Sequence, residues 1–91
     1  MNGIIRERII GKGALKYSLT ETNDNGIHRY GVTVTSTLFG ETPETAAVDD
    51  ISADMETAVR FFDMAVENLV LPCTLKDVAE NYIADIFSVK S

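Results

Sequence analysis

The sequence predicts an α+β fold, in which an antiparallel β-meander of three to four strands is followed by a C-terminal α-hairpin packed on one sheet face. Hydrophobic residues alternate in the first half of the chain and recur every three or four positions in the second half, which marks a change from strand to helix. The charge changes at the same place, since residues 1–40 carry five basic and three acidic side chains, and residues 41–91 carry three basic and eleven acidic ones. A mildly basic sheet therefore precedes a strongly acidic pair of helices.

Length and composition are those of one globular domain. A chain of 91 residues can build a single small core, and its 45% hydrophobic and 24% charged residues are typical of a folded protein. We expect one α+β domain over residues 1–91, with strands within 4–51 and helices at about 53–70 and 75–89.

Three strands are expected in the first half of the chain. The apolar run 4–10 ends at a glycine-rich turn, and which side of this strand faces the core is ambiguous. In the second strand, Leu15, Tyr17 and Leu19 alternate with polar residues, which places them on one sheet face. A third strand is expected from residue 27 to about 38.

The turn between the second and third strands predicts their register. Asn25-Gly26 is a favoured pair for a two-residue type I′ hairpin, because both residues tolerate the positive φ that this turn requires. Such a loop places Tyr17 opposite Val34 and Leu19 opposite Val32, so the apolar residues of both strands share one face.

A fourth strand is expected at 45–51, after a loop. Two alternatives describe its inward residues: Ala46 with Val48, or Ala47 with Ile51. Gly31, inside the third strand, indicates a bulge or a close approach of another backbone.

The first helix begins near Ser52 or Asp54, either of which can cap it, and Glu56 can pair with Arg60 one turn further on. The spacing predicts a buried stripe of Met55, Ala58, Val59, Phe62, Val66 and Leu69.

The second helix follows a short loop, in which Val70-Leu71-Pro72 ends the first helix. Thr74 is the predicted N-cap, and Cys73 is placed to pack on Val78 as a hydrophobic staple. The predicted buried stripe is Leu75, Val78, Ala79, Tyr82, Ile83, Ile86 and Phe87. Because the loop is short, the two helices should form an antiparallel pair over the apolar sheet face.

Four segments of the sequence resemble a known family. They are Lys16-Tyr17-Ser18-Leu19-Thr20-Glu21, Tyr30-Gly31-Val32-Thr33-Val34, Val48-Asp49-Asp50-Ile51-Ser52, and Pro72 followed by Leu75-Lys76-Asp77-Val78-Ala79-Glu80. Through them the chain, from about Leu15 to Phe87, is similar to a family of small Gram-positive bacterial proteins described only as a domain of unknown function. The resemblance implies no activity and no functional residue.

Charge and targeting signals argue against several classes of function. A net charge of −6 and a pI near 4.5 disfavour nucleic acid and anionic membrane surfaces as partners. Three charges break the N-terminal apolar run, so we expect neither a signal peptide nor a membrane span. The single cysteine, Cys73, fits a reducing compartment, and we expect the protein in the cytoplasm.

The candidate chemical groups form no recognisable catalytic or metal-binding pattern. His28 is the only histidine, and the spacing identifies no acid, thiol or second histidine beside it. Asp50, Ser52 and Asp54 mimic the start of a calcium loop, but the glycine and the glutamate that such a loop needs later are absent. Asp49 and Asp50 are adjacent, and they point to opposite faces if they lie in a strand. We therefore predict no cofactor and no metal site.

A polar, uncharged sheet face is the one surface that suggests a function. Thr33, Thr35 and Thr37 lie opposite the apolar face and join Ser18 and Thr20. Threonine favours strands, so this face can be an ordinary solvated surface, or it can be a contact surface for a second copy or another protein.

Two functional hypotheses follow. The first is a non-enzymatic cytoplasmic module for protein interaction or regulation, with a protein partner or a homodimer joined through the strand half, at the face of Thr33, Thr35 and Thr37 or at a neighbouring strand edge. The alternative is a small ligand-binding domain or enzyme whose site lies near Tyr17, Tyr30 and His28. The sequence identifies no small-molecule ligand for this alternative.

Overall fold

The computed structural model of the protein describes residues 2–37 and 42–88, with side chains for all of these except residues 2, 24 and 85–88. Its elements are the strands β1 (Asn2–Ile10), β2 (Leu15–Asp24), β3 (Ile27–Ser36) and β4 (Glu44–Ser52), followed by the helices α1 (Met55–Glu67) and α2 (Pro72–Ser88). The predicted strand end at residue 38, the predicted helix end at residue 89 and the side chains of Ile86 and Phe87 lie outside what is described.

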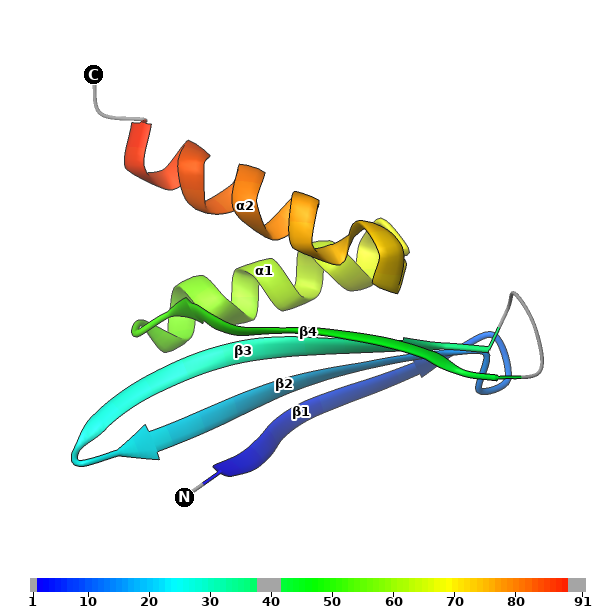
Figure 1. The fold of residues 1–91 in the computed structure, drawn as a ribbon, viewed down its shortest axis with the longest axis horizontal. Helices are drawn as coiled ribbons and strands as arrows, with labels where there is room; N and C mark the ends of the chain where they lie inside the picture. Colours follow the sequence, from blue (N-terminus) through cyan, green and yellow to red (C-terminus); the bar gives the residue numbers. More distant parts are fainter. Residues whose placement is uncertain (1, 38–41, 89–91) are drawn as a thin grey trace.

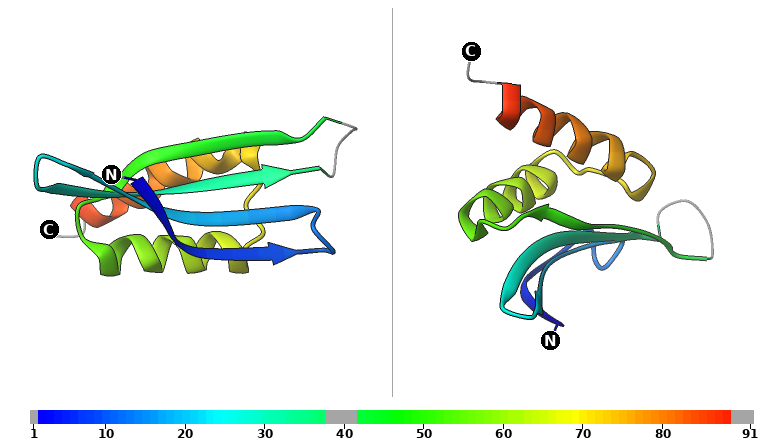
Figure 2. Two further views of the ribbon diagram at one scale, coloured as in Figure 1. Left: turned by 90° about the horizontal axis from the view of Figure 1, so that it is seen from below. Right: turned by 60° about the vertical axis from the view of Figure 1, so that its left-hand side comes forward.

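The strands form one antiparallel sheet of four in chain order, β1-β2-β3-β4. Both helices lie on the same side of this sheet (Figure 1), where α1 contacts β2 and β3 and α2 contacts mainly β4. The view from below shows α1 behind the β1 half and α2 behind the β4 half (Figure 2). The predicted fold class, a meander followed by two helices on one sheet face, is confirmed.

The β2–β3 hairpin has the predicted turn and the predicted register. Asn25 and Gly26 have φ of 55° and 81°, as a type I′ turn requires. Tyr17 pairs with Val34, and Leu19 pairs with Val32.

The ambiguous facing of β1 has a structural cause, which is a register shift between Ile4 and Arg6. Ile5 and Ile10 pack against the core, whereas Ile4 and Ile9 are 60% and 58% exposed. An irregularity of this kind changes which positions face inward, so alternation alone does not predict the buried side of β1.

A second register shift separates β3 from β4 between Tyr30 and Val32, at Gly31. A β-carbon on Gly31 would collide with the backbone carbonyl oxygens of Val48 and Asp49. Both predictions for Gly31, the bulge and the close backbone approach, are therefore confirmed.

The same shift explains the inward residues of β4. Before it, Ala46 and Val48 are half-buried against the core, and Ala47 is exposed. After it, Ile51 is only 6% exposed. The alternative of Ala46 with Val48 is thus confirmed, and the alternative of Ala47 with Ile51 is right only at Ile51, because the facing changes within the strand.

The core joins the sheet to both helices. Its fully buried side chains from the sheet are Tyr17, Leu19, Val32 and Val34, and those from the helices are Ala58, Phe61, Ala65 and Leu75. The predicted stripe of α1 was wrong at its ends, since Met55 and Leu69 are 44% and 52% exposed. The helix ends at Glu67, and Leu69 lies in the following turn with a φ of 51°.

The start of α1 has the predicted cap. The backbone N–H and the hydroxyl of Thr57 donate to Oδ2 of Asp54 at 3.0 and 2.7 Å, and the Asp54 N–H donates to Oγ of Ser52 at 2.9 Å. The predicted pair of Glu56 and Arg60 is present at 2.9 Å.

The predicted start of the second helix was wrong. Pro72 is the first residue of α2, a position that proline favours because it has no N–H to leave unpaired. Thr74 therefore lies inside the helix, and its hydroxyl donates to the carbonyl of Leu71 at 3.2 Å. Cys73 is exposed and does not form the predicted hydrophobic staple. The predicted stripe of α2 is confirmed at Leu75 and Ala79, which are buried.

Candidate functional site

The sheet face without helices is the largest candidate surface, and we call it the open face. Strand alternation and register place these side chains on it: Ile4, Glu7, Ile9, Lys16, Ser18, Thr20, Thr22, Thr33, Thr35, Thr45, Ala47 and Asp49. The left view of Figure 2 looks directly at this face, with both helices behind the sheet. Most of these side chains are uncharged, and several are β-branched.

The predicted threonines lie on or beside the open face. Thr33 and Thr35 are half-buried, and the hydroxyls of Thr35 and Thr45 are 3.2 Å apart across the β3–β4 pair. Thr37 follows β3 and is exposed, and its backbone N–H donates to the carbonyl of Ala14 at 3.0 Å.

The centre of the open face has small side chains. Ser18 pairs with Thr33, which pairs with Ala47, and Ser18 is only 7% exposed. Beside this row, a shallow hollow of about 340 Å³ is lined by Gly3, Ile4, Thr20, Thr22, Thr33 and Asp49. Because its side chains are small, another surface can approach the centre of the open face closely.

Two ion pairs lie on or beside the open face, and Asp49, also on this face, belongs to neither of them. Lys16 Nζ lies 3.2 Å from Glu7 Oε2, and Arg29 Nε lies 3.8 Å from Asp50 Oδ2. Exposed pairs of this kind contribute only about 0–1 kcal/mol to stability. The two pairs balance each other's charges and leave Asp49 as the net negative charge of the face.

Asp49 and Asp50 share one hollow with Thr22 and Arg29. The expectation that these adjacent carboxylates point to opposite faces stays a prediction, because sharing a hollow does not fix the direction of either side chain. The register shift that begins beside them interrupts the alternation on which the expectation depended.

A second candidate site is a cluster around Glu21 near the β2–β3 turn. Glu21 Oε2 lies 2.7 Å from Nδ1 of His28, and the Tyr30 hydroxyl donates to the same oxygen at 3.4 Å. Burial, and then the charge and hydrogen bond of Glu21, raise the pKa of Tyr30. Sequence reasoning missed Glu21, although the predicted register places it directly opposite Tyr30.

Tyr17 is not part of this cluster. Its hydroxyl donates to the carbonyl oxygen of Val70 at 3.0 Å in the core, and burial raises its pKa. Of the three residues named for a ligand or enzyme site, the structure brings together Tyr30 and His28, through Glu21, and leaves Tyr17 apart.

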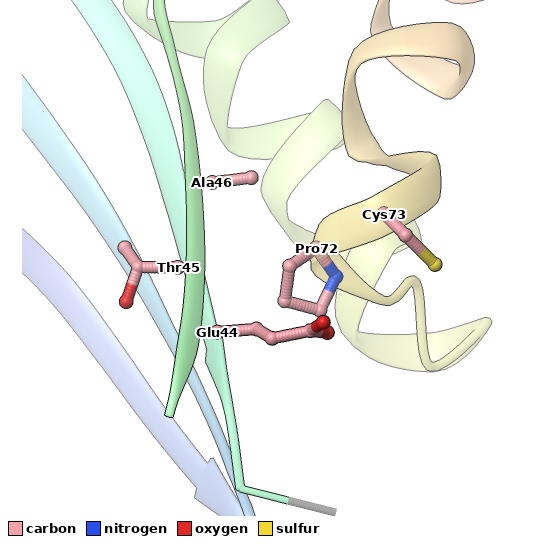
Figure 3. A pocket seen from close by; sticks show the side chains of 5 residues that line it. All are labelled: Glu44, Thr45, Ala46, Pro72 and Cys73. Carbon is pink, nitrogen blue, oxygen red and sulfur yellow. The ribbon is translucent and has the colours of Figure 1, made fainter. Parts of the chain in front are cut away.

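A notch of about 270 Å³ lies between β4 and the start of α2, lined by Glu44, Thr45, Ala46, Pro72 and Cys73. Figure 3 shows Glu44 and Ala46 pointing toward α2, whereas the Cys73 sulfur points away from β4. The notch therefore does not combine the thiol with the carboxylate in one site.

In the part of the chain that the structure describes, no three His, Cys, Asp or Glu side chains gather where a metal ion could bind. Within the same residues, neither helix is long and apolar enough to cross a membrane.

Comparison with known proteins identifies the family of the chain but no function for it. A family model described as a family of unknown function, DUF6514, matches residues 5–85. No curated protein and no solved structure matches the chain.

Proposed function

The chain belongs to the family of unknown function DUF6514, which supplies no activity, and we propose a function from its exposed surface. The protein is a small non-enzymatic interaction module that acts through its open face, in the cytoplasm of a Gram-positive bacterium.

This proposal rests on the observation that helices cover only one face of the sheet. Both helices pack on one face, and the other exposes Ile4 and Ile9 at 60% and 58% beside a field of serine and threonine. Hydroxyl groups cost less to remove from water than ionised groups, and charged residues are depleted at the centres of protein interfaces. A face of this composition is suited to contact with another protein.

Site-specific photo-crosslinking in cells tests the proposal. A photoreactive amino acid replaces Thr33 at the centre of the open face, and in a matched control it replaces Asn81, which is exposed on α2. We expect defined crosslinked protein adducts from position 33 and few from position 81. Equal background labelling at both positions would contradict an interaction through the open face.

The Glu21 cluster supports a second candidate function, the binding of a small polar molecule. The imidazole of His28 and the phenol of Tyr30 both lie within 3.4 Å of one carboxylate oxygen of Glu21. The test is a two-dimensional NMR titration with acetate, phosphate, AMP and ethanolamine. Shifts confined to these three residues, and lost in Glu21→Gln, would support a ligand site there.

A further inference from the structure

We propose that the partner of the open face is the open face of a second copy of this chain. The two copies are related by a two-fold axis that crosses the strands, so that Ile4 of each copy packs on Ile9 of the other. This inference rests on the proposed function, because it names the partner of the same surface.

The distribution of charge favours a contact between open faces. The two helices carry the acidic excess of the chain, and they lie on the side of the sheet away from the open face. On or beside the open face, Lys16 is paired with Glu7 at 3.2 Å and Arg29 with Asp50 at 3.8 Å, and Asp49 adds one acidic side chain that belongs to neither pair. Two open faces can therefore meet while the acidic helices stay outside, where solvent and salt screen them.

The positions of the isoleucines select the direction of the axis. Ile4 pairs with Thr20 and Ile9 pairs with Lys16, so the level midway between them passes close to Ser18. An axis across the strands at this level stacks β1 on β1 and exchanges the two isoleucine positions. An axis along the strands would stack β1 on β4 instead, and it would bring Ile4 toward the end of β4 that carries Asp49.

The small central side chains fit this axis. Ser18, Thr33 and Ala47 form one row across the sheet at the level of the axis. Glu7 lies in the same row on β1, so this axis sets it opposite Glu7 of the second copy, and Lys16 of each copy, 3.2 Å from its own Glu7, offsets part of that repulsion. Small side chains on the axis let the two sheets approach to the separation of about 10 Å that packed sheets adopt.

Pairing through the free edge of β1 is disfavoured. A symmetric antiparallel pair of β1 strands sets one central residue opposite its own copy. Arg6, Glu7 and Arg8 occupy the centre of β1, so each central register opposes like charges.

The area of the open face predicts a weak dimer. Four strands about 4.8 Å apart, over some six residues of about 3.3 Å rise, give on the order of 400 Å² per copy. The total of roughly 800 Å², which treats both surfaces as flat, is below the roughly 1,200 Å² at which stable interfaces begin and is typical of weak, transient contacts. We expect a dimer that forms at high micromolar concentration and dissociates on dilution.

Sedimentation velocity over a concentration series tests whether the dimer forms. The parent protein, Thr33→Lys and the control Asn81→Lys are compared, because both variants add one positive charge, on the open face and on α2 respectively. We expect Thr33→Lys to weaken the dimer at least tenfold and Asn81→Lys to leave it unchanged, with thermal melts showing that all three are folded. A monomer at every concentration overturns the inference, and so does a dimer that only Asn81→Lys disrupts.

Cysteine pairing tests the direction of the axis and does not depend on Thr33. In a Cys73→Ser background, Ile4→Cys and Ile9→Cys are treated with a short bis-maleimide, separately and as a mixture. We expect crosslinked dimers mainly in the mixture, because the reagent can join thiols that face each other across sheets about 10 Å apart, whereas positions 4 and 9 are offset by a further distance of about 16 Å along the strand. Self-crosslinking of either variant to the same extent as the mixture overturns the proposed axis.

The outcomes separate this inference from the proposed function. One outcome is that position 33 forms crosslinks to a different protein in cells while sedimentation shows only a monomer. This outcome would overturn self-association and still support the proposed interaction module. The absence of any open-face crosslink would overturn both.

Discussion

The Tyr17 hydroxyl donates a 3.0 Å hydrogen bond to the carbonyl oxygen of Val70, across 53 positions of the chain. Tyr17 lies on β2 and Val70 in the turn between the helices, and both residues are buried. The bond thus ties the helical half of the molecule to the middle of the sheet, and it satisfies a carbonyl group that water does not easily reach.

Tyr17→Phe should destabilise the protein by about 1–3 kcal/mol, because it leaves the Val70 carbonyl without its partner in the core. Urea unfolding measures the loss. The control is Tyr82→Phe, since the half-buried Tyr82 ring packs 5.1 Å from Phe61 and the substitution keeps that ring. If both variants unfold at the same urea concentration, the hydroxyl of Tyr17 contributes no more to stability than the hydroxyl of Tyr82.

Gly31→Ala should lower the free energy of unfolding by at least about 1–3 kcal/mol, because its new β-carbon meets the backbone of Val48 and Asp49. Backbone atoms cannot turn aside as a side chain can. Gly3→Ala is the matched control, since a β-carbon at Gly3 meets nothing within 4 Å. Thermal denaturation of both variants measures the difference, and an unchanged melting temperature for Gly31→Ala would contradict the close approach of β4.

Phe61→Ala should cost about 3–5 kcal/mol, as is typical for removing a buried phenylalanine, whereas Met55→Ala should cost far less. Phe61 is fully buried, and Met55 is 44% exposed. Chemical denaturation of the two variants compares the buried face of α1 in the structure with the stripe predicted from spacing. A larger loss for Met55→Ala would favour the predicted stripe.

The free energy of unfolding should fall at acidic pH, because the Asp54 carboxylate that caps α1 becomes protonated. Hydrogen bonds from the side chain and then the backbone of Thr57 lower its pKa. Because the folded pKa lies below the unfolded value of about 3.9, the contribution is complete well above that value and is lost as the pH falls through the folded pKa.

The test compares the parent protein with Asp54→Asn, which can still cap the helix but does not titrate. Urea unfolding is measured at several pH values from neutral to about 3. We expect a constant difference between the two proteins at neutral and mildly acidic pH, and a change in that difference below about pH 4. Parallel curves over the whole range would mean that the Asp54 charge contributes nothing to the cap.

The sequence predicts the β2–β3 hairpin well because two independent signals agree there. The Asn25-Gly26 turn and the alternation of both strands allow one register, and a slip of one residue would expose every apolar side chain. The facing of β1 and of β4 could not be predicted in this way. Each contains a register shift. The second shift accompanies the close backbone approach at Gly31, which involves β4, a strand distant in sequence.

The helix boundaries were harder to predict than the helices themselves. Met55 and Leu69 continue the apolar spacing of α1, but Met55 lies at its first turn and Leu69 lies beyond its end. The sequence pattern predicts that Pro72 ends one helix, whereas in the structure it begins the next. Proline ends a helix and also suits a first helical position, so the residue alone does not distinguish the two cases.

The candidate sites were predicted unevenly. Thr33 and Thr35 were placed on the correct face because strand alternation alone decides it. The partner of His28 was missed because spacing along one segment of a sequence does not reveal residues on a neighbouring strand. Glu21 lies on the neighbouring strand, and the predicted register would have placed it beside Tyr30 and His28.

The order of the strands in the sheet has a consequence for the way the chain folds. Each strand pairs with its neighbour in the chain, so every ladder can form by closing a short loop, and loops of this length close rapidly. The hydrogen bond between Tyr17 and Val70 requires most of the chain to be in place first. We therefore expect the hairpins to appear early in refolding and the docking of the helices to be the slower step, so that Tyr17→Phe accelerates unfolding more than it slows folding.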